Sequence, residues 1–283
     1  MSRLVDLLKI QLLRFDIARR RAGVYIVSYP KSGRTWLRVL IGKAVCAQSS
    51  LPEELMLDTY RLTAAAGLRP TYFTHDYSEI LTALPYHRLP TTKTEYARSR
   101  IIFVVRDVKD VLVSSYFQAT RRTHRFKGSV SEFIRSDRFG ARKIVTFYNI
   151  WHQNRHIPEE FVLIRYEDMH RDPAEALARA LRAIGVAQID GATLRDAVAF
   201  GSFEHMKEME ISGFFNDPRM RPGDANDEES FKVRKGLVGG HTAYLEEDDI
   251  RYIESTIAEL SCPFVQAQPV ALNGLPSVQF ANS

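Results

Sequence analysis

Short apolar runs alternate along the chain with stretches whose apolar positions follow helical spacing. The runs are GVYIVSY (23–29), TYFTH (71–75), RIIFVVR (100–106) and FVLIRY (161–166). Helical spacing marks residues 35–46, 107–118 and 172–185. Short continuous apolar runs are typical of parallel strands that are covered on both faces. The pattern therefore predicts an α/β fold in a single domain: a parallel sheet flanked by helices on both faces.

The two ends of the chain fall outside this alternation. Residues 1–22 are basic and amphipathic, and charged side chains interrupt their apolar stripe, unlike a secretory signal. We expect an N-terminal helix there that packs on the domain, with peripheral membrane contact as the alternative. The main domain is placed in residues 23–265 and a C-terminal tail in residues 266–283. No apolar stretch is long enough to predict a membrane-spanning helix.

One stretch late in the chain changes composition abruptly. Residues 211–235 are rich in Gly, Pro, Asn and Asp and predict a long loop, the kind of segment that often serves as a lid. Residues 246–260 then predict a closing helix with acidic residues in its first turn.

Composition narrows the class of ligand rather than the fold. The 283 residues carry a formal net charge of +5, which favours anionic ligands without choosing among nucleotides, membranes and nucleic acids. Two cysteines are too few for a disulfide framework and suit a cytoplasmic protein.

The segment SYPKSGRTW (28–36) joins the first predicted strand to a helix. In such a turn the backbone N–H groups and the helix dipole attract an anion. Lys31 adds a mobile charge, Gly33 permits close backbone approach, and Thr35 adds a hydroxyl donor. The Gly-Lys-Ser/Thr ending of a nucleoside-triphosphate loop is missing. The segment predicts an anion-binding loop, with an ordinary strand-to-helix turn as the alternative.

Two further basic motifs follow. Arg106 ends a predicted strand, and Ser114 lies two helical turns beyond it. Ligands gather at the carboxyl ends of parallel strands, so Arg106 should face the same cleft as the loop; a surface ion pair with Asp107 or Asp110 is the alternative. In FKVRKGLVGG (231–240) a basic cluster follows the long loop, which suggests a flap over an anion or a solvated run of charge.

Together these motifs resemble those of sulfotransferases that use 3′-phosphoadenosine 5′-phosphosulfate (PAPS). YPKSGRTW, VVRDVKDVLVSS, YEDM (166–169) and RKGLVGG occur in the family's order and spacing, and the resemblance runs from about residue 23 to 260. It implies a P-loop-like fold, binding of PAPS and of its desulfated product PAP, and no metal.

The resemblance also assigns residues to the parts of the donor. The 5′-phosphosulfate would be bound by Lys31, Ser32, Gly33, Arg34 and Thr35. The adenine would lie against Trp36, Tyr166 and Phe203. The 3′-phosphate would be bound by Arg106, Ser114, Arg234, Lys235 and Gly236.

The same resemblance implies the catalytic groups. A histidine is suited to remove the acceptor's hydroxyl proton near neutral pH. His75 follows Thr74 at the end of a strand, as the family's catalytic histidine does. Lys31 would donate to the oxygen that bridges sulfur and phosphorus, and Ser114 would restrain Lys31 until the acceptor arrives. The expected reaction is a direct in-line transfer.

Several positions depart from the cytosolic animal enzymes. Those commonly carry a basic residue where this chain has Phe73 and a threonine where it has Gly201, and they continue with Asp-Trp-Lys at residues 240–242. Their short dimerisation motif is also missing. The first three departures concern individual contacts and not the class of nucleotide, and without the last motif the sequence does not predict that type of dimer. The chain resembles a bacterial member of the family more than an animal one.

Two other functions remain open on the sequence. A P-loop kinase or ATPase would need a lysine between Gly33 and Thr35 and a carboxylate for Mg²⁺. A non-enzymatic protein that binds a membrane or nucleic acid would use the basic N-terminus and residues 120–128. In an enzyme, residues 120–128 would line the acceptor entrance or form a solvated face, and we expect the solvated face. We expect no nucleic-acid partner. The acceptor, a small molecule, sugar or lipid with a hydroxyl group, would contact residues 119–160 and 211–231.

Overall fold

Four parallel strands form the sheet of the computed structural model, which describes residues 23–215, 217 and 220–265. They are β1 (Val24–Ser28), β2 (Thr71–Thr74), β3 (Arg100–Val105) and β4 (Glu160–Arg165), in the order β2-β1-β3-β4. Each coincides with one of the predicted apolar runs, which confirms the predicted fold class. The N-terminal helix expected in residues 1–22 and the tail at 266–283 lie outside the described residues.

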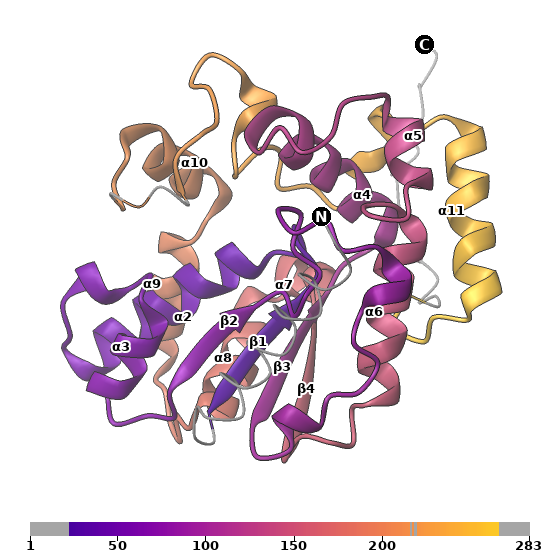
Figure 1. Cartoon of the computed structure of the whole chain (residues 1–283). Helices are drawn as coiled ribbons and strands as arrows, with labels where there is room; N and C mark the ends of the chain where they lie inside the picture. The colour runs from indigo at the N-terminus through magenta and orange to yellow at the C-terminus, as the bar shows by residue number, and fades with distance from the viewer. Residues whose placement is uncertain (1–22, 216, 218–219, 266–283) are drawn as a thin grey trace, which may run out of the picture.

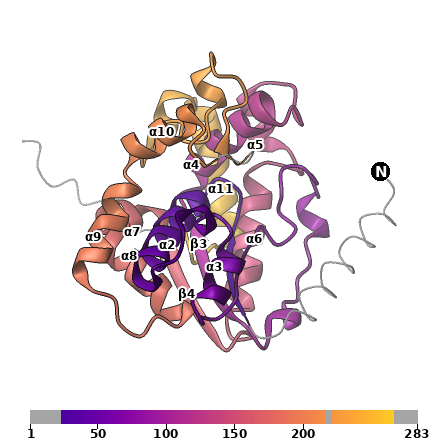
Figure 2. The same ribbon diagram turned by 90° about the vertical axis from the view of Figure 1, so that its left-hand side faces the viewer.

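Successive side chains of each strand point alternately into two hydrophobic cores, one on each face of the sheet. Val24 and Ile26 of β1 contribute to one core, whereas Tyr25 and Val27 contribute to the other. Successive side chains of a strand point to opposite faces, so a strand that is apolar throughout needs cover on both sides. This is the physical reason for the two helical layers in Figures 1 and 2.

Different helices bury the two faces. One face is covered by α2 (Arg34–Ser49), α3 (Thr59–Ala65), α7 (Tyr166–Arg171), α8 (Pro173–Ile184) and α9 (Gly191–Phe200). The other is covered by α4 (Val108–Phe117), α5 (Val130–Arg135), α6 (Ala141–Gln153) and α11 (Glu247–Leu260). The predicted helices at 35–46, 107–118, 172–185 and 246–260 are all present, with slightly different ends. No helix within the described ranges has the length and apolar character needed to cross a bilayer.

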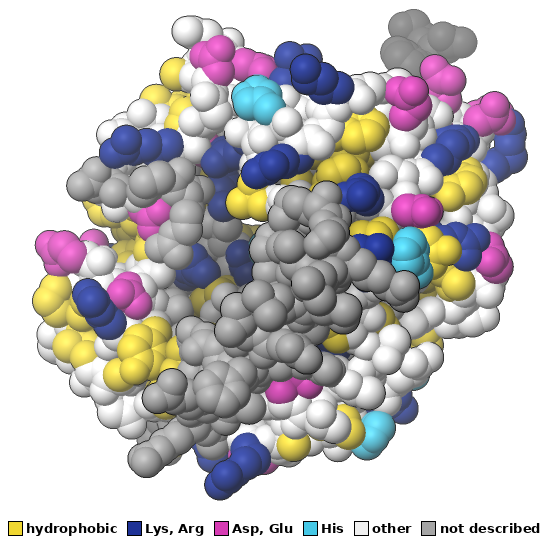
Figure 3. Space-filling view, viewed as in Figure 1, with side chains coloured by type: hydrophobic (Ala, Val, Ile, Leu, Met, Phe, Trp, Pro, Cys, Tyr) yellow, Lys and Arg dark blue, Asp and Glu magenta, His cyan; other side chains and the backbone are white. Residues whose placement is uncertain are grey.

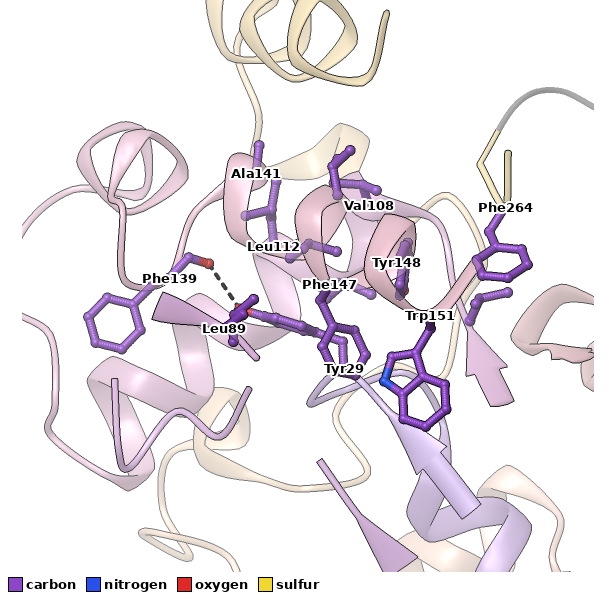
Figure 4. Packing of buried hydrophobic residues seen from close by; sticks show 14 of the residues in the cluster. Tyr29, Leu89, Val108, Leu112, Phe139, Ala141, Phe147, Tyr148, Trp151 and Phe264 are labelled. Atoms are coloured by element: carbon purple, nitrogen blue, oxygen red, sulfur yellow. Dashed lines mark hydrogen bonds between the residues drawn. The ribbon is translucent and has the colours of Figure 1, made fainter. Parts of the chain in front are cut away.

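Aromatic side chains fill the core beneath α6. Phe147 and Trp151 of α6 pack against Phe103 of β3, and the hydroxyl of Tyr29 donates a hydrogen bond to the carbonyl of Phe139 over 3.4 Å (Figure 4). Tyr29 directly follows β1, so this packing fixes the point at which the chain enters the predicted anion loop.

A buried carboxylate fixes the end of β2 in the same way. Asp76 is 1% exposed and pairs with the Lys93 ammonium at 2.6 Å. It also accepts hydrogen bonds from Tyr96 Oη at 3.0 Å and Trp151 Nε1 at 2.9 Å. A buried charge with this many partners holds its backbone rigidly. His75, the residue before Asp76, therefore has a fixed position.

The segments that follow the strands gather at one end of the sheet. In Figures 1 and 2, α4, α5 and α10 (Phe203–Ser212) lie beyond the carboxyl ends of the strands. The chain between α10 and α11 lies at this same end and includes the short turns Glu228–Ser230 and Gly240–Ala243. The predicted long loop is thus largely confirmed, although α10 extends into its first residues.

Candidate active site

The turn from β1 into α2 adopts the backbone of an anion-binding loop. Gly33 caps α2 with φ of 89°, and Lys31 also has positive φ, at 70°. A Cβ atom on residue 33 would lie 2.5 Å from Cδ2 of Tyr166. Only glycine meets both constraints, because other residues would clash and rarely adopt this φ. The first N–H groups of the 16-residue α2 remain available to an anion.

A cavity of about 660 Å³ opens at the carboxyl ends of the strands. Figure 3 shows a recess on this side of the molecule with Lys and Arg side chains inside it. Nearly all of the predicted site residues line the cavity: Lys31, Gly33, Arg34, Thr35, Trp36, His75, Arg106, Ser114, Tyr166, Phe203, Arg234, Lys235 and Gly236. Ser32 is fully buried instead and does not belong to the lining.

Arg106 joins the anion loop to the flap, which we define as residues 231–241. Its Nη1 donates to the carbonyl of Lys31 over 3.3 Å, and its Nη2 donates to the carbonyl of Leu237 over 2.9 Å. The guanidinium carbon lies 4.1 Å from the centre of the Tyr166 ring. The loop, the strand end and the flap therefore share one cavity. Arg106 also forms an ion pair with Asp110 at 3.4 Å, which the sequence offered as the alternative. Arg106 therefore lines the cavity and pairs with a carboxylate at the same time.

Asp110 is a residue whose importance the sequence did not reveal. Its carboxylate is buried and accepts hydrogen bonds from the backbone N–H groups of Gly239 (2.8 Å) and His241 (3.0 Å) and from His241 Nδ1 (2.9 Å). Burial alone would raise the pKa of Asp110, but these bonds and the Arg106 charge lower it. Asp110 thus anchors the end of the flap to α4.

Asp107, Asp110 and His241 have side-chain ligand atoms within 4.8 Å of one another, a spacing that can suit a metal ion. However, Arg106 lies against Asp110, and Asp107 Oδ1 caps α4 by accepting from the N–H of Asp110 over 3.1 Å. The cluster therefore acts as an ionic anchor for the flap in this structure.

The rest of the flap packs on aromatic rings. A Cβ atom on Gly236, whose φ is 60°, would lie 2.3 Å from Cδ2 of Phe203. Arg234 donates 2.8 Å hydrogen bonds to Glu229 Oε2 and Tyr244 Oη, and the Lys235 ammonium lies 4.6 Å from the centre of the Tyr244 ring. Glycine at 236 lets the flap lie directly on the Phe203 ring.

Two of the three predicted adenine-binding rings, those of Trp36 and Tyr166, pack together with His170, whereas Phe203 lies against the flap. The ring of Trp36 lies 6.0 Å from that of Tyr166 and 5.0 Å from that of His170, centre to centre. Within the described ranges, Trp36 Nε1 and Arg106 Nε are buried without a hydrogen-bond partner. Unpaired buried donors are costly, and a polar ligand can satisfy them.

His75 is held in one tautomer. Its Nδ1 lies 2.8 Å from the carbonyl oxygen of Ser28, which can only accept, so Nδ1 carries the proton and Nε2 remains a proton acceptor. Burial lowers the pKa of His75 well below its ordinary value, and the nearby charges of Arg34 and Lys232 lower it further against the effect of the Ser28 bond. A neutral imidazole with an available Nε2 is the form that a general base requires.

The pKa of Lys31 is also lowered well below its ordinary value. Burial is the largest cause, followed by repulsion from Lys232 and Arg122. Ser114 lines the same cavity, but no hydrogen bond joins it to Lys31 in the described part of the chain. The restraining role of Ser114 therefore stays a prediction.

The basic segment 120–128 is mostly exposed, as a solvated face requires. The side chains that face solvent are those of Arg121, His124, Arg125 and Lys127. Arg122 is the exception, because its side chain is largely buried and donates to the carbonyls of Ser230 (3.0 Å) and Arg221 (2.8 Å). Arg122 also pairs with the buried Glu210 at 3.4 Å. The residues that Arg122 contacts lie far away in the sequence, so no local pattern could reveal them.

The parallel sheet, the glycine-containing loop and the cationic cavity define a protein that binds an anionic ligand at the carboxyl ends of its strands. A family model described as Sulfotransferase domain matches residues 22–261. The chain therefore belongs to the sulfotransferase family, as predicted from its motifs. This membership favours a sulfotransferase over a kinase or a non-enzymatic binding protein.

Individual relatives agree with the family. Flavonol 3-sulfotransferase of Flaveria bidentis is 25% identical over 83% of this chain and 80% of its own length. Sulfotransferase 4A1 of Mus musculus is 31% identical over 60% of this chain and 62% of its own length. The crystal structure of mouse sulfotransferase SULT7A1 complexed with PAP superposes with a TM-score of 0.61 at 20% identity, covering 88% of each chain.

Proposed function

We propose that this sulfotransferase moves a sulfuryl group directly from PAPS to the hydroxyl of an acceptor, with His75 as general base. One observation carries the proposal: the loop with Lys31, the strand end with Arg106, and His75 line a single cavity. A donor with negative charge at both ends can contact both basic groups while its sulfur faces the base.

The described residues fit such a donor. Arg34 and Thr35 line the cavity, and we assign them, with the first N–H groups of α2, to the 5′-phosphosulfate. Gly33 and Gly236 bring the backbone directly against Tyr166 and Phe203, where a side chain would clash. The unpaired donors Arg106 Nε and Trp36 Nε1 are available to polar atoms of the nucleotide. For the 3′-phosphate we assign Arg106, Ser114, Arg234 and Lys235.

The transfer is balanced without any further reactant. The acceptor oxygen attacks sulfur as its proton passes to Nε2 of His75. The bond between sulfur and the bridging oxygen breaks, and its electron pair stays on the 5′-phosphate of the departing PAP. Lys31 donates a hydrogen bond to that oxygen as charge develops there. The sulfate ester forms, and His75 then returns its proton to solvent.

For the acceptor we propose a small molecule with a hydroxyl group. Glu79, Ile80 and Leu81 line the cavity close after His75 in the chain, which gives this wall both apolar and polar character. Burial raises the pKa of Glu79, and Asp76 raises it further, so this carboxyl is a polar group on the wall where an acceptor hydroxyl would lie. A flavonol is a reasonable first probe because a relative is named for one; sugars and lipids are further candidates.

We also propose a cytoplasmic location. Both cysteines, Cys46 and Cys262, are buried free thiols, which suits a reducing compartment. Membrane contact through residues 1–22 stays a prediction, since that segment lies outside the described residues.

The test measures transfer of radiolabelled sulfate from PAPS to a panel of hydroxyl compounds: a flavonol, a simple phenol, a steroid alcohol and a sugar, in excess EDTA. We expect His75→Ala to lower kcat at least about a hundredfold, because general-base catalysis contributes that much, with little change in PAP affinity.

His205→Ala is a matched control. His205 Nδ1 also lies 2.8 Å from a carbonyl, that of Phe200, but the residue is not part of the cavity lining. It should keep the wild-type rate. Full activity in His75→Ala would remove His75 from its role, and wild-type protein that labels no acceptor on the panel would count against the proposed activity.

A further inference from the structure

Lys232 is a cation of the cavity to which the expected roles assign nothing. It lines the same cavity as Lys31 and His75. Its ammonium makes no hydrogen bond or ion pair to any residue in the described ranges, whereas Arg234 pairs with Glu229 and Arg106 with Asp110. A partly buried ammonium without an anionic partner is costly, so its place indicates an anion that is supplied by a ligand.

The backbone at Lys232 is held firmly. The carboxylate of the buried Glu210 accepts from the N–H of Lys232 and the N–H of Val233, both over 2.7 Å. The Arg122 guanidinium, from the segment that follows α4, pairs with the same carboxylate at 3.4 Å. Glu210 is therefore engaged with the backbone and with Arg122, and it fixes the base of the Lys232 side chain at the cavity wall.

The Lys232 charge acts on both reacting ends of the site. Lys232 lines the same cavity as Lys31 and His75, and its charge contributes to lowering the pKa of each. In the proposed reaction Lys31 faces the leaving oxygen and His75 faces the attacking oxygen. An in-line transfer places sulfur between these two oxygens. A cation on the wall of the cavity that holds both groups can reach the sulfuryl oxygens, where negative charge is concentrated during transfer.

We propose that Lys232 is a further catalytic residue, which donates hydrogen bonds to the non-bridging oxygens of the sulfuryl group during its transfer. This inference rests on the proposed function. It also accounts for a departure seen in the sequence. Position 73, where a basic residue is common, holds Phe73, whose ring packs against the Arg38 guanidinium at 4.3 Å. Lys232 supplies a cation from the flap instead.

One consequence concerns the choice of donor. The flap carries Arg234 and Lys235 for the 3′-phosphate and Lys232 for the sulfuryl group within four residues. One segment therefore carries cations for both ends of the donor, and Glu210 fixes the Lys232 backbone before a donor binds.

The experiment compares Lys232→Met and Lys232→Arg with wild type on the best acceptor of the panel, with PAP affinity measured by calorimetry. PAP lacks the sulfuryl group, so Lys232→Met should lower kcat at least about a hundredfold, the cost of one lost transition-state donor, and change PAP affinity less than about threefold. Lys232→Arg should recover at least about a tenth of the rate, because it restores a cationic donor.

Lys207→Met is the matched control. Lys207 lies on α10, pairs with Glu228 at 3.6 Å and does not line the cavity, so its loss should leave kcat unchanged. A Lys232→Met variant with kcat within about threefold of wild type would overturn the inference, as would a loss of PAP affinity as large as the loss of kcat. Wild type without any transfer would instead contradict the proposed function.

Discussion

Three side chains at the site have pKa values displaced by burial and by mutual repulsion. His75 and Lys31 are both shifted well below their ordinary values, and the pKa of Lys232 falls to about 7. In the ligand-free protein, neighbouring positive charges oppose one another at the cavity. An anionic donor relieves that repulsion and favours the charged forms of Lys31 and Lys232, whereas His75 acts as the base in its neutral form.

The pH dependence of kcat/KM for PAPS tests these shifts, because this parameter reports ionisations of the free enzyme. Lys232 faces Arg122, Arg34, Arg38 and Glu210, and burial followed by the arginines lowers its pKa to about 7. It is charged below that pKa and neutral above it. The rate constant should therefore fall as pH rises through about 7.

In Lys232→Arg, the fall in kcat/KM as pH rises through about 7 should disappear, since arginine stays charged throughout the range. As the pH is lowered, His75 stays neutral until the pH is well below its ordinary pKa of 6.5. Protonation of His75 should therefore cost little kcat/KM between pH 8 and 6.5. An alkaline limb near pH 7 that persists unchanged in Lys232→Arg would assign the ionisation to another group.

At the scale of elements, the flap (residues 231–241) is held by two buried carboxylates from different helices. Glu210 of α10 binds its start through the N–H groups of Lys232 and Val233, and Asp110 of α4 binds its end. Between them the flap rests on an aromatic ring. This arrangement places Lys232, Arg234 and Lys235 at the cavity on a segment that is neither helix nor strand.

Gly236→Ala tests the flap directly. The added methyl group would lie 2.3 Å from the Phe203 ring at φ of 60°, so the flap must move away from the adenine-binding wall. We expect PAP affinity to fall at least about tenfold in calorimetry, the equivalent of 1.4 kcal/mol.

Gly213→Ala controls for backbone strain alone. Gly213 has φ of 68°, but nothing lies within 4 Å of an added Cβ, and the residue caps α10 away from the cavity lining. It should cost about 1 kcal/mol of stability and leave PAP affinity unchanged. Equal losses of affinity in both variants would mean that the contact with Phe203 is not the cause.

At the scale of the whole molecule, the sequence predicted the parts that depend on local pattern. The four strands, the loop around Gly33 and the strand-end positions of Arg106 and His75 follow from apolar runs and short motifs. Asp110, Glu210 and Arg122 were missed because their roles depend on partners up to 131 residues away in the chain. For the same reason, the burial of Arg122 within the otherwise exposed segment 120–128 could not be predicted.

The central claim is that one nucleotide is bound at both of its charged ends, by the Lys31 loop and by Arg106 with the flap. Calorimetry with PAP, AMP and adenosine 3′-phosphate tests it most directly. Removing either phosphate gives up charge-assisted hydrogen bonds, so PAP should bind at least about tenfold more tightly than each monophosphate. PAP affinity no higher than that of one of the monophosphates would contradict the account.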